Sequence, residues 1–491
     1  MTRASRWALA FAAGALWAFC FGREPLAVAP WFALVPLLLL WSSGGNASIG
    51  WFHGLGFWMA GISWIPATLR TFGSLPGWMA AAALVLLAGY LGTYHAAFSW
   101  LGARLWRRGG VLDLAAVPAL WVALEVVRTH VFTGFPWNLA GYSAAALPGA
   151  LDATAWVGSY GLSAIVVATN LAVARSIQRR AWAPAVWTCL SVLLFFGVSG
   201  RLAEAPSESG SPRAVTILQP NIANLTEWDP QAAEANYRRV FELSTDACHP
   251  GELLVWPESA AWPYAYRPGS RLQRDIAALV RSGCTLLFNS PFELDGSYYN
   301  AALLKSPGGS AGELDGRYDK QHLVPFGEYV PLGHWLPFLE RIARAAGDFA
   351  PGPSPGNLSW RGESLGAAIC FEVTFPGEVA AKVGAGATVL VTVTNDAWYG
   401  DTWAPWQHLR AAQFRAAENR RPLLRSAITG VSAVIGPRGQ LLQTLGVDQE
   451  GTISASVVGG SAETFYTRAP WAVSVLAFAL VAFVIFRESR R

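Results

Sequence analysis

Charged residues are scarce in this chain of 491 residues. They make up 14% of it, against about 25% in an ordinary soluble domain. Lysine occurs only at Lys305, Lys320 and Lys382, so the net charge of +4 comes from scattered arginines rather than from a basic face. With 53% hydrophobic residues, the chain is built partly for lipid, and no basic, aromatic-rich patch points to a nucleic acid partner.

Cysteine and histidine are also few and widely spaced. The five cysteines contain no C-x-x-C pair, and the seven histidines show no H-E-x-x-H and no other paired spacing. Metal sites need such ligands at close, regular spacing, so we expect no metal and no cofactor. Cys248 and Cys284 each end a predicted helix just before a predicted strand, and either a disulfide or two unbonded thiols fits the sequence.

Long hydrophobic runs fill most of the first 200 residues. Several approach or exceed the roughly 20 residues that cross a bilayer. The first run resembles a signal peptide, but no small-residue cleavage site follows it, because "FCFGREP" leads straight into the next run. We therefore predict eight membrane spans, at residues 7–21, 26–41, 49–69, 76–101, 111–127, 153–174, 181–198 and 471–486.

The arginines between these runs indicate an orientation. If the N-terminus is cytoplasmic, the short outer loops between spans hold only Arg23, Arg70 and Arg128. The inner side then holds Arg3, Arg6, Arg104, Arg107, Arg108, Arg175, Arg179, Arg180, Arg487, Arg490 and Arg491. Positive charge is enriched on the cytoplasmic side of membrane proteins. Both termini are therefore predicted to be cytoplasmic, and the region after the seventh span lies outside the cytoplasm.

The amino-acid composition of the chain changes after Gly200. Residues 201–213, "RLAEAPSESGSPR", form a linker, and the chain divides into a seven-span membrane domain (1–200), this linker, a domain at 214–460 and a closing span at 470–487. Alternating strands and helices predict a layered α/β fold for the third part. Strands are predicted at 214–221, 252–259, 285–292, 365–373 and 387–396, helices at 229–247, 270–283, 376–386 and 406–422, and a hairpin at 432–445.

Three chemically active side chains fall at strand ends or in the loops that follow. Glu258 closes "LLVWPE", Lys320 lies in "GRYDKQHLVPFGEYVP", and Cys370 closes "LGAAIC". Taken singly, a strand-end cysteine is usually a small buried hydrophobe, the glutamate could cap a helix, and the lysine could be solvated. Together they supply a nucleophile, a base and a cation for an oxyanion without using histidine.

Four segments carry a resemblance to a known family: "LLVWPES", "YDKQHLVPFGEYVP", "ICFEVTFP" and residues 394–439, which begin "TNDAWYGD". They resemble the nitrilase, or carbon–nitrogen hydrolase, superfamily and, within it, the apolipoprotein N-acyltransferase family. The resemblance extends to "TGFPW" (133–137) and covers nearly the whole chain. It implies a multi-span helical membrane domain of about eight helices and a periplasmic nitrilase-like αββα sandwich.

The resemblance also implies roles for individual residues. Cys370 would be the nucleophile, Glu258 the general base, and Lys320 the group that stabilises the oxyanion. Glu328 and Glu372 would be supporting carboxylates of the active site.

Three aromatic residues are expected to contact substrate. Trp228 matches a family tryptophan near the substrate path, and Phe371 stands where the family often has tyrosine, which keeps the ring and loses the hydroxyl. Trp335 belongs to one of two aromatic arms, 260–269 and 330–349, that could form lipid-facing lids or cap the domain's own core. The aromatic and aliphatic residues of these arms are Trp262, Tyr264, Tyr266, Trp335, Leu336, Phe338 and Leu339.

The implied reaction is a ping-pong acyl transfer in the bacterial inner membrane. A phospholipid, expected to be phosphatidylethanolamine, donates its sn-1 acyl chain to Cys370, and the α-amino group of a diacylglyceryl apolipoprotein then accepts it. We expect a monomer. The alternatives are a membrane-tethered amidase of the nitrilase type that uses the same three residues, and a multi-span scaffold that has lost activity. The intact residues argue against the scaffold, and the membrane frame argues against a hydrolase of soluble amides.

Overall fold

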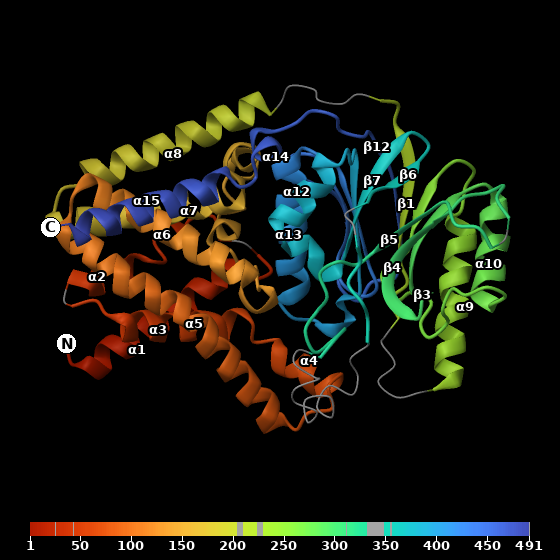
Figure 1. The fold of residues 1–491 in the computed structure, drawn as a ribbon, viewed down its shortest axis with the longest axis horizontal. Helices are drawn as coiled ribbons and strands as arrows, with labels where there is room; N and C mark the ends of the chain where they lie inside the picture. Colours follow the sequence, from red (N-terminus) through yellow and green to blue (C-terminus); the bar gives the residue numbers. More distant parts are fainter. Residues whose placement is uncertain are drawn as a thin grey trace. The chain divides into compact units, whose positions relative to one another are not determined.

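The computed structural model describes residues 1–24, 26–42, 44–203, 210–222, 229–310, 312–330, 348–353 and 356–490. The chain divides into two units. The first comprises Met1–Pro66, Pro76–Pro206 and Arg468–Arg491, and its regular elements are helices. The second comprises Ala67–Leu75 and Ser207–Thr467 and contains two β-sheets with helices packed on them (Figure 1).

Apolar sequence forms helices in the first unit because a helix satisfies its own backbone hydrogen bonds, as lipid requires. Among the described residues, four helical segments are long and apolar enough to cross a membrane: Arg3–Phe21, Gly77–Arg108, Ala150–Arg179 and Ala183–Leu202. Shorter apolar helices lie at Ala29–Ser42 and Ala472–Arg487. The α-helices are α1 (Arg3–Ala18), α2 (Val35–Ser42), α3 (Ala47–Gly61), α4 (Ile65–Thr71), α5 (Gly77–Arg108), α6 (Val111–His130), α7 (Ala150–Arg179), α8 (Ala183–Leu202) and α15 (Ala472–Ser489).

The predicted span at 49–69 is not one continuous helix. The run at 49–69 is divided, because α3 ends at Gly61 and α4 begins at Ile65. Ile62 leaves the helical region, with φ −123° and ψ 31°. Pro66 follows in the first turn of α4, where its missing N–H and its ring prevent the helix from running on from α3. The hydrophobic pattern in the sequence continues across the break between α3 and α4, so it did not predict where the helix ends.

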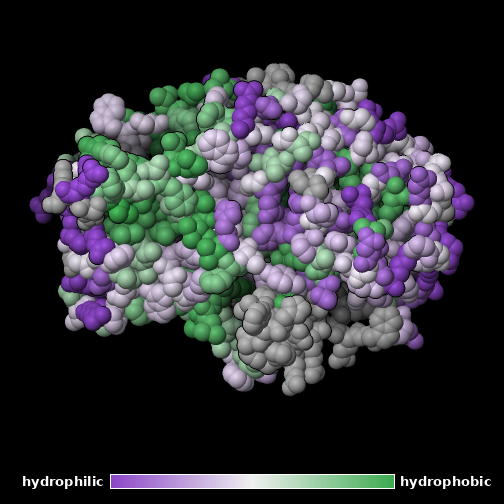
Figure 2. Space-filling model, in the orientation of Figure 1, coloured by the Kyte–Doolittle hydropathy of each residue, from purple (hydrophilic) through white to green (hydrophobic). Residues whose placement is uncertain are grey.

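The surface of the first unit is strongly apolar. Only 17% of the apolar stretch of α8 is buried, and the side chains of Trp187 and Leu194 are 69% and 68% exposed. The helices of this unit carry broad hydrophobic surface in the space-filling view, whereas hydrophilic side chains cover most of the second unit (Figure 2). Large exposed apolar areas mark surfaces that contact lipid or protein, so α8 fits a membrane environment.

Glycines allow α3 to approach both α1 and α5 closely. A Cβ atom on Gly50 would lie 2.2 Å from the His95 carbonyl oxygen, and one on Gly56 would lie 2.1 Å from that of Phe11. Gly54 meets the backbone of α5 in the same way, with its Cβ position 2.7 Å from Gly92 Cα. Lipid provides no hydrophobic force between helices, so close backbone packing through small residues supplies much of their association.

The second unit is an αββα sandwich, in agreement with the layered α/β prediction. One sheet has the strand order β12-β1-β2-β3-β4-β5 and the other β11-β10-β9-β8-β7-β6. The two hydrophobic clusters outside the sheets pack α9 and α10 on the first sheet and α12 and α13 on the second (Figure 1). The strands of the first sheet are β1 (Arg213–Gln219), β2 (Leu253–Val255), β3 (Thr285–Leu294), β4 (Ser297–Lys305), β5 (Gly316–Asp319) and β12 (Gly451–Val457). Those of the second are β6 (Leu358–Trp360), β7 (Glu363–Ile369), β8 (Val389–Thr394), β9 (Leu423–Ala427), β10 (Ser432–Ile435) and β11 (Leu441–Leu445), and the helices are α9 (Pro230–Ala247), α10 (Arg271–Leu279), α12 (Pro376–Gly384), α13 (Ala404–Asn419) and α14 (Phe465–Arg468).

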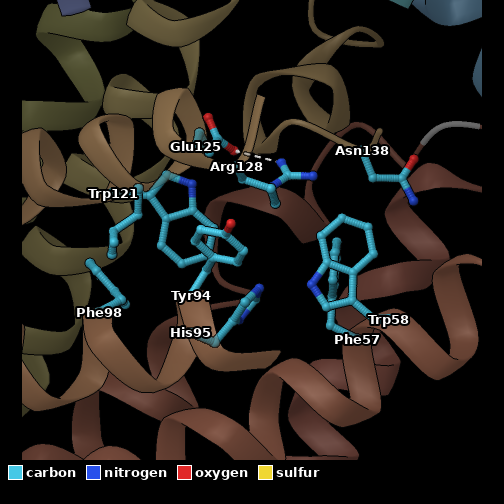
Figure 3. A pocket seen from close by; sticks show the side chains of 10 residues that line it. Phe57, Trp58, Tyr94, His95, Phe98, Trp121, Glu125, Arg128 and Asn138 are labelled. Carbon is cyan, nitrogen blue, oxygen red and sulfur yellow. Dashed lines mark ion pairs between the residues drawn. The ribbon is translucent and has the colours of Figure 1, made fainter. Parts of the chain in front are cut away.

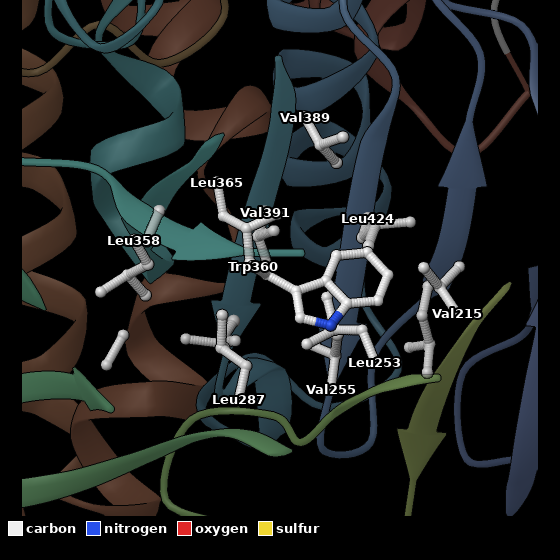
Figure 4. Packing of buried hydrophobic residues seen from close by; sticks show 14 of the residues in the cluster. Val215, Leu253, Val255, Leu287, Leu358, Trp360, Leu365, Val389, Val391 and Leu424 are labelled. Carbon is white, nitrogen blue, oxygen red and sulfur yellow. The ribbon is translucent and has the colours of Figure 1, made fainter. Parts of the chain in front are cut away.

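The main core lies between the two sheets. Val255 and Leu287 from the first sheet and Val391 and Leu424 from the second are at most 1% exposed, and Trp360 lies among them (Figure 4). The strands β1-β2-β3 and β7-β8-β9 are parallel. Parallel strands are covered on both faces, which explains why their sequences read as continuous apolar runs.

The two cysteines left open by the sequence are joined. Cys248 and Cys284 form a disulfide with a Cα–Cα distance of 5.3 Å. The bond connects the end of α9 to the residue before β3, so the arrangement with two unbonded thiols is not the one found. The free cysteines are Cys20, Cys189 and Cys370.

The close approach of α3 and α5 generates a stability prediction. Replacing Gly50 with alanine forces a methyl group against a backbone oxygen that cannot move alone, and we expect a loss of about 1–3 kcal/mol of stability. Gly89→Ala on α5 is the matched control, because its Cβ would meet nothing closer than 3.6 Å. Thermal unfolding of the purified protein in detergent measures both. Equal unfolding midpoints for the two variants would show that the close contact is unimportant.

Candidate active site

The three residues singled out at strand ends come together in the sandwich. Glu258 follows β2, Lys320 follows β5 directly, and Cys370 follows β7 directly. Lys320 Nζ lies 3.7 Å from Glu258 Oε1, and the charges of both side chains shift the pKa of Cys370. All three are at least nine-tenths buried. The ends of strands from both sheets therefore build one site, which the sequence predicted only as separate positions.

Glu328 is part of the same cluster. Lys320 Nζ lies 2.9 Å from Glu328 Oε1 and 2.8 Å from Oε2, so this carboxylate is its main partner. The Val324 backbone N–H donates to Oε2 (2.8 Å), and Asn300 Nδ2 donates to Oε1 (2.6 Å). Burial alone would lower the pKa of Lys320, but the charges of Glu328 and Glu258 reverse that effect and raise it. The ammonium group therefore stays charged.

The carboxylate of Glu258 is held in a buried position, where its negative charge is unfavourable. Asn300 Nδ2 donates to Oε1 (2.9 Å), and the Asn395 backbone N–H donates to Oε2 (3.0 Å). Burial raises the pKa of the Glu258 carboxyl, Lys320 opposes the shift, and the charge of Glu328 adds to it. A carboxylate with a raised pKa and fixed orientation is suited to take and return a proton.

Cys370 sits in a strained turn and carries a proton at rest. Its φ is 53°, in the left-handed region, and a short 3-10 helix, η6 (Cys370–Thr374), begins there. Burial and the charge of Glu258 raise the pKa of the thiol, although Lys320 lowers it. The thiolate is the nucleophilic form. Attack by this thiol would therefore require a neighbouring base to remove its proton.

Glu372 is a buried side chain that accepts several hydrogen bonds beside Cys370. Its Oε1 accepts from Tyr318 Oη (2.7 Å) and from the backbone N–H groups of Gln321 (2.7 Å) and His322 (3.2 Å). Its Oε2 accepts from the Ile369 N–H (2.7 Å). One carboxylate thus links the residue before Cys370 to the two residues after Lys320. It contacts neither thiol nor ammonium in these bonds, so it positions them.

A second buried chain of polar groups reaches Cys370 from the other side. His408 Nε2 lies 3.0 Å from the Cys370 carbonyl oxygen, and His408 Nδ1 lies 3.1 Å from Asp396 Oδ1. Arg425 Nη2 donates to Asp396 Oδ2 (2.5 Å). Burial opposes the charge of Asp396, yet Arg425 and the bonds from His408 and Thr394 lower its pKa to about 2.

The sequence analysis assigned no role to several of these residues. Asn300 lies on β4, a strand that was not predicted, and it touches both Glu258 and Glu328. Asn395, Asp396 and His408 lie in the segment 394–439 that carried the family resemblance, and the polar "TND" after an apolar strand was the only local signal. Among the described residues, no group of three or more His, Cys, Asp or Glu side chains could hold a metal ion.

The aromatic residues expected near substrate have different outcomes. Phe371 is buried next to Cys370, and its ring centroid lies 5.1 Å from that of Phe375 and 5.8 Å from that of His322. Trp228 and Trp335 lie outside the described residues, as do Leu336, Phe338 and Leu339.

Two residues of the first aromatic arm belong to the domain's own core. The ring of Tyr264 lies 4.5 Å from that of Tyr237, and Tyr266 is 4% exposed and packs on Phe288. Both favour the core alternative, Tyr266 as a buried residue and Tyr264 as a partly buried one. Trp262 is 53% exposed.

The first unit contains a small, largely buried pocket of a different kind. Glu125 and Arg128 face it together with aromatic rings such as Trp58 and Tyr94 (Figure 3). Arg128 Nη1 donates to the carbonyl oxygens of Phe135 and Trp137, both at 2.7 Å. The arginine therefore holds the "TGFPW" loop in shape, which gives that motif a structural role within this unit.

The bonds of Glu372 generate a second prediction. In Glu372→Gln one carboxylate oxygen becomes an NH₂ group, so either the Ile369 N–H or the donors on the other oxygen lose their acceptor. An unsatisfied buried donor costs about 1–3 kcal/mol, and we expect a lower unfolding midpoint and slower thiol chemistry. Glu242→Gln is the control, since its side chain is 63% exposed in a surface pair worth about 0–1 kcal/mol. If Glu372→Gln unfolds at the same temperature as the wild type, the hydrogen bonds of Glu372 do not stabilise the site as we expect.

Comparison with known proteins follows the same division of the chain. Residues 13–172 match the family model of the apolipoprotein N-acyltransferase N-terminal domain, and residues 214–465 match that of the carbon-nitrogen hydrolases. Among solved structures, Saccharomyces cerevisiae Nit3, a member of branch 10 of the nitrilase superfamily, covers 54% of this chain and 96% of its own with 18% identity and a TM-score of 0.40. That score is low, so the family assignment rests on sequence.

Similar sequences span nearly the whole chain. The apolipoprotein N-acyltransferase of Geobacter metallireducens is 36% identical over 98% of this chain and 95% of its own. Those of Brucella suis and Haemophilus ducreyi are 33% and 30% identical, over 88% and 99% of this chain and 83% and 93% of their own. With both parts matched and the identity sustained from end to end, the chain belongs to the apolipoprotein N-acyltransferase family.

Proposed function

We propose that this protein transfers an acyl chain from a phospholipid, through a thioester on Cys370, to the α-amino group of the N-terminal S-diacylglyceryl-cysteine of apolipoproteins. The observation that carries the proposal is the buried cluster of Cys370, Glu258 and Lys320 in a chain whose relatives are apolipoprotein N-acyltransferases over nearly their full length. This cluster offers a nucleophile, a base and a fixed positive charge. Those are the groups that acyl transfer requires.

The first half-reaction forms the thioester. Glu258 takes the thiol proton as the sulfur of Cys370 attacks the ester carbonyl, and Lys320 stabilises the negative oxygen of the tetrahedral intermediate. The C–O bond of the ester then breaks, and Glu258 returns the proton to the departing oxygen of the lysophospholipid. Glu328 supports this step by holding Lys320, whose ammonium group lies 2.8 Å from its Oε2.

The second half-reaction forms the amide. The neutral α-amino group attacks the thioester carbonyl, Lys320 again stabilises the oxyanion, and Glu258 accepts a proton from the nitrogen. The C–S bond breaks, and the sulfur of Cys370 takes the proton back to regenerate the thiol. A membrane-tethered amidase would use the same residues with water as the acceptor, but the family to which the chain belongs does not favour that alternative.

The membrane part of the proposal rests on the sequence and on the surface of the helices. Eight spans over domains at 1–200 and 470–487, cytoplasmic termini and a periplasmic catalytic domain at 214–460 fit the distribution of arginines. The exposed apolar faces of α8 and α15 fit lipid. We further propose phosphatidylethanolamine as donor, a bacterial inner-membrane location and a monomer, with Trp228, Trp335 and Phe371 along the substrate path.

Acyl-enzyme formation is the primary test. Purified protein incubated with phosphatidylethanolamine should gain the mass of one acyl chain, and a diacylglyceryl peptide should discharge it into an amide. Cys370→Ala should show no adduct, while the control Cys189→Ala, which alters another free cysteine, should form it normally. Discharge mainly by water would indicate a hydrolase, and the absence of any adduct on the wild-type protein would refute acyl transfer.

The pH dependence of acylation tests the role of Glu258. The base must be ionised, and its pKa is raised, so the acylation rate should fall as the pH is lowered through a value above that of an ordinary glutamate. In Glu328→Gln a negative charge that raises this pKa is removed while Lys320 remains, so the acidic limb should move to lower pH. Burst formation of the acyl-enzyme across a pH series gives both curves. A limb that stays in place, or moves to higher pH, contradicts the assignment.

A further inference from the structure

The buried chain Arg425–Asp396–His408 ends on the backbone of the nucleophile rather than on a substrate or on the thiol. We propose that His408 is a positioning residue that holds Cys370 in its left-handed conformation and so aims the thiol at Glu258 and Lys320. This inference rests on the proposed role of Cys370 as the nucleophile. It assigns a function to a polar chain beside Cys370 that the acyl-transfer steps leave unused.

The conformation of Cys370 needs a restraint. A side chain with a Cβ atom disfavours the left-handed region, and glycine is the residue that adopts it freely. Cys370 cannot be glycine if it is to supply sulfur, so the surrounding contacts must hold its φ of 53°. Strained residues of this kind persist only where neighbouring structure determines them.

Hydrogen bonds clamp the turn on both sides of the residue. On the preceding side, Glu372 Oε2 accepts from the Ile369 N–H at 2.7 Å. On the following side, His408 Nε2 lies 3.0 Å from the Cys370 carbonyl oxygen. The first clamp fixes the entry into the turn and the second fixes the peptide group that leaves it.

The partners of His408 fix its proton and its orientation. A carbonyl oxygen only accepts, so Nε2 must carry a proton and donate to Cys370. Nδ1 lies 3.3 Å from the donor Arg425 Nη2 and 3.1 Å from Asp396 Oδ1, and Asp396 is itself held by Arg425 and by Thr394 Oγ1 at 2.9 Å. His408, Arg425 and Asp396 are all at most 1% exposed.

Burying the chain Arg425–Asp396–His408 costs folding free energy, so we expect it to have a function that apolar side chains could not provide. Burying charged and polar groups away from water is unfavourable, and apolar replacements of the same volume are often at least as stable. His408 comes from the first turns of α13, with Leu409 and Ala412 of the same helix in the apolar cluster on the outer face of the second sheet. The polar side chain is thus found where the helix passes the turn at Cys370.

Two variants of similar size separate donation from packing. His408→Gln places an amide N–H near the position of Nε2, whereas His408→Met fills the space without a donor. We expect His408→Met to lower the single-turnover acylation rate at saturating phospholipid by about 10-fold or more, the scale of a left-handed preference. His408→Gln should recover most of that loss, with the half-saturating phospholipid concentration unchanged in both.

Gln413→Met is the matched control. It removes a side-chain bond from the same helix to a backbone carbonyl, from Gln413 Nε2 to Gly439 at 2.9 Å, but away from Cys370. It should acylate like the wild type. Wild-type rates in His408→Met, or equal losses in the Met and Gln variants, would overturn the proposal. A loss in Gln413→Met equal to that in His408→Met would also overturn it, because the effect would then be general to the helix.

Two further measurements test the positioning role of His408 even if its variants do not fold or if the wild-type protein forms no acyl adduct. If neither His408 variant folds, histidine-labelled wild-type protein is examined by ¹⁵N NMR, where an unprotonated Nε2 on His408 contradicts the assigned bond. If the wild-type protein forms no acyl adduct, alkylation of Cys370 by iodoacetamide is followed by peptide mass mapping. Slower alkylation in His408→Met than in His408→Gln then still supports the positioning role, and equal rates refute it.

Discussion

The left-handed turn at Cys370 is the constraint on which the rest of the site depends. A strand that ends inside a sandwich must turn sharply to present a side chain at the sheet's edge, and here a cysteine makes that turn at φ 53°. Glu372 holds the residue before it and, through the same carboxylate, the N–H groups of Gln321 and His322 beside Lys320. One buried side chain therefore bonds the backbone next to both the thiol and the ammonium group.

Charge balance follows from this geometry. Lys320 lies within 4 Å of two carboxylates, Glu328 and Glu258, and the closer one satisfies it. Burial raises the pKa of both Glu258 and Cys370, Lys320 opposes the two shifts, and the charge of a neighbouring carboxylate adds to each of them. A resting site with a protonated thiol is protected from unwanted reaction. Both pKa shifts arise from burial together with the spacing of the cluster, so neither belongs to a single residue.

The sequence predicted those parts of the fold whose pattern is local. Alternating apolar and amphipathic segments indicated the α/β layers, and motifs at strand ends placed Glu258, Lys320 and Cys370 where the structure brings them together. The hairpin of β3 and β4 is local, with its turn at Asp295 and Gly296, but the role of Asn300 could not be read from it, because its bonds to Glu258 and Glu328 join segments that are separate in the sequence. The break between α3 and α4 was hidden by hydrophobicity that continues across it, and the pairing of Cys248 with Cys284 depends on how α9 and β3 meet.

Different forces stabilise the interior of each unit. The second unit also contains a short segment from early in the sequence. The sandwich relies on apolar burial between its sheets, while α1, α3 and α5 rely on glycine-mediated backbone contact. The second unit also includes Ala67–Leu75, where Thr68 Oγ1 donates to the Trp398 carbonyl (2.7 Å) and the ring of Phe72 lies 4.4 Å from that of Trp398. Trp398 ends the 3-10 turn that begins at Asp396, next to the Asn395 N–H that binds Glu258. A segment from the N-terminal, largely helical part of the sequence thus contacts the loop whose backbone binds Glu258.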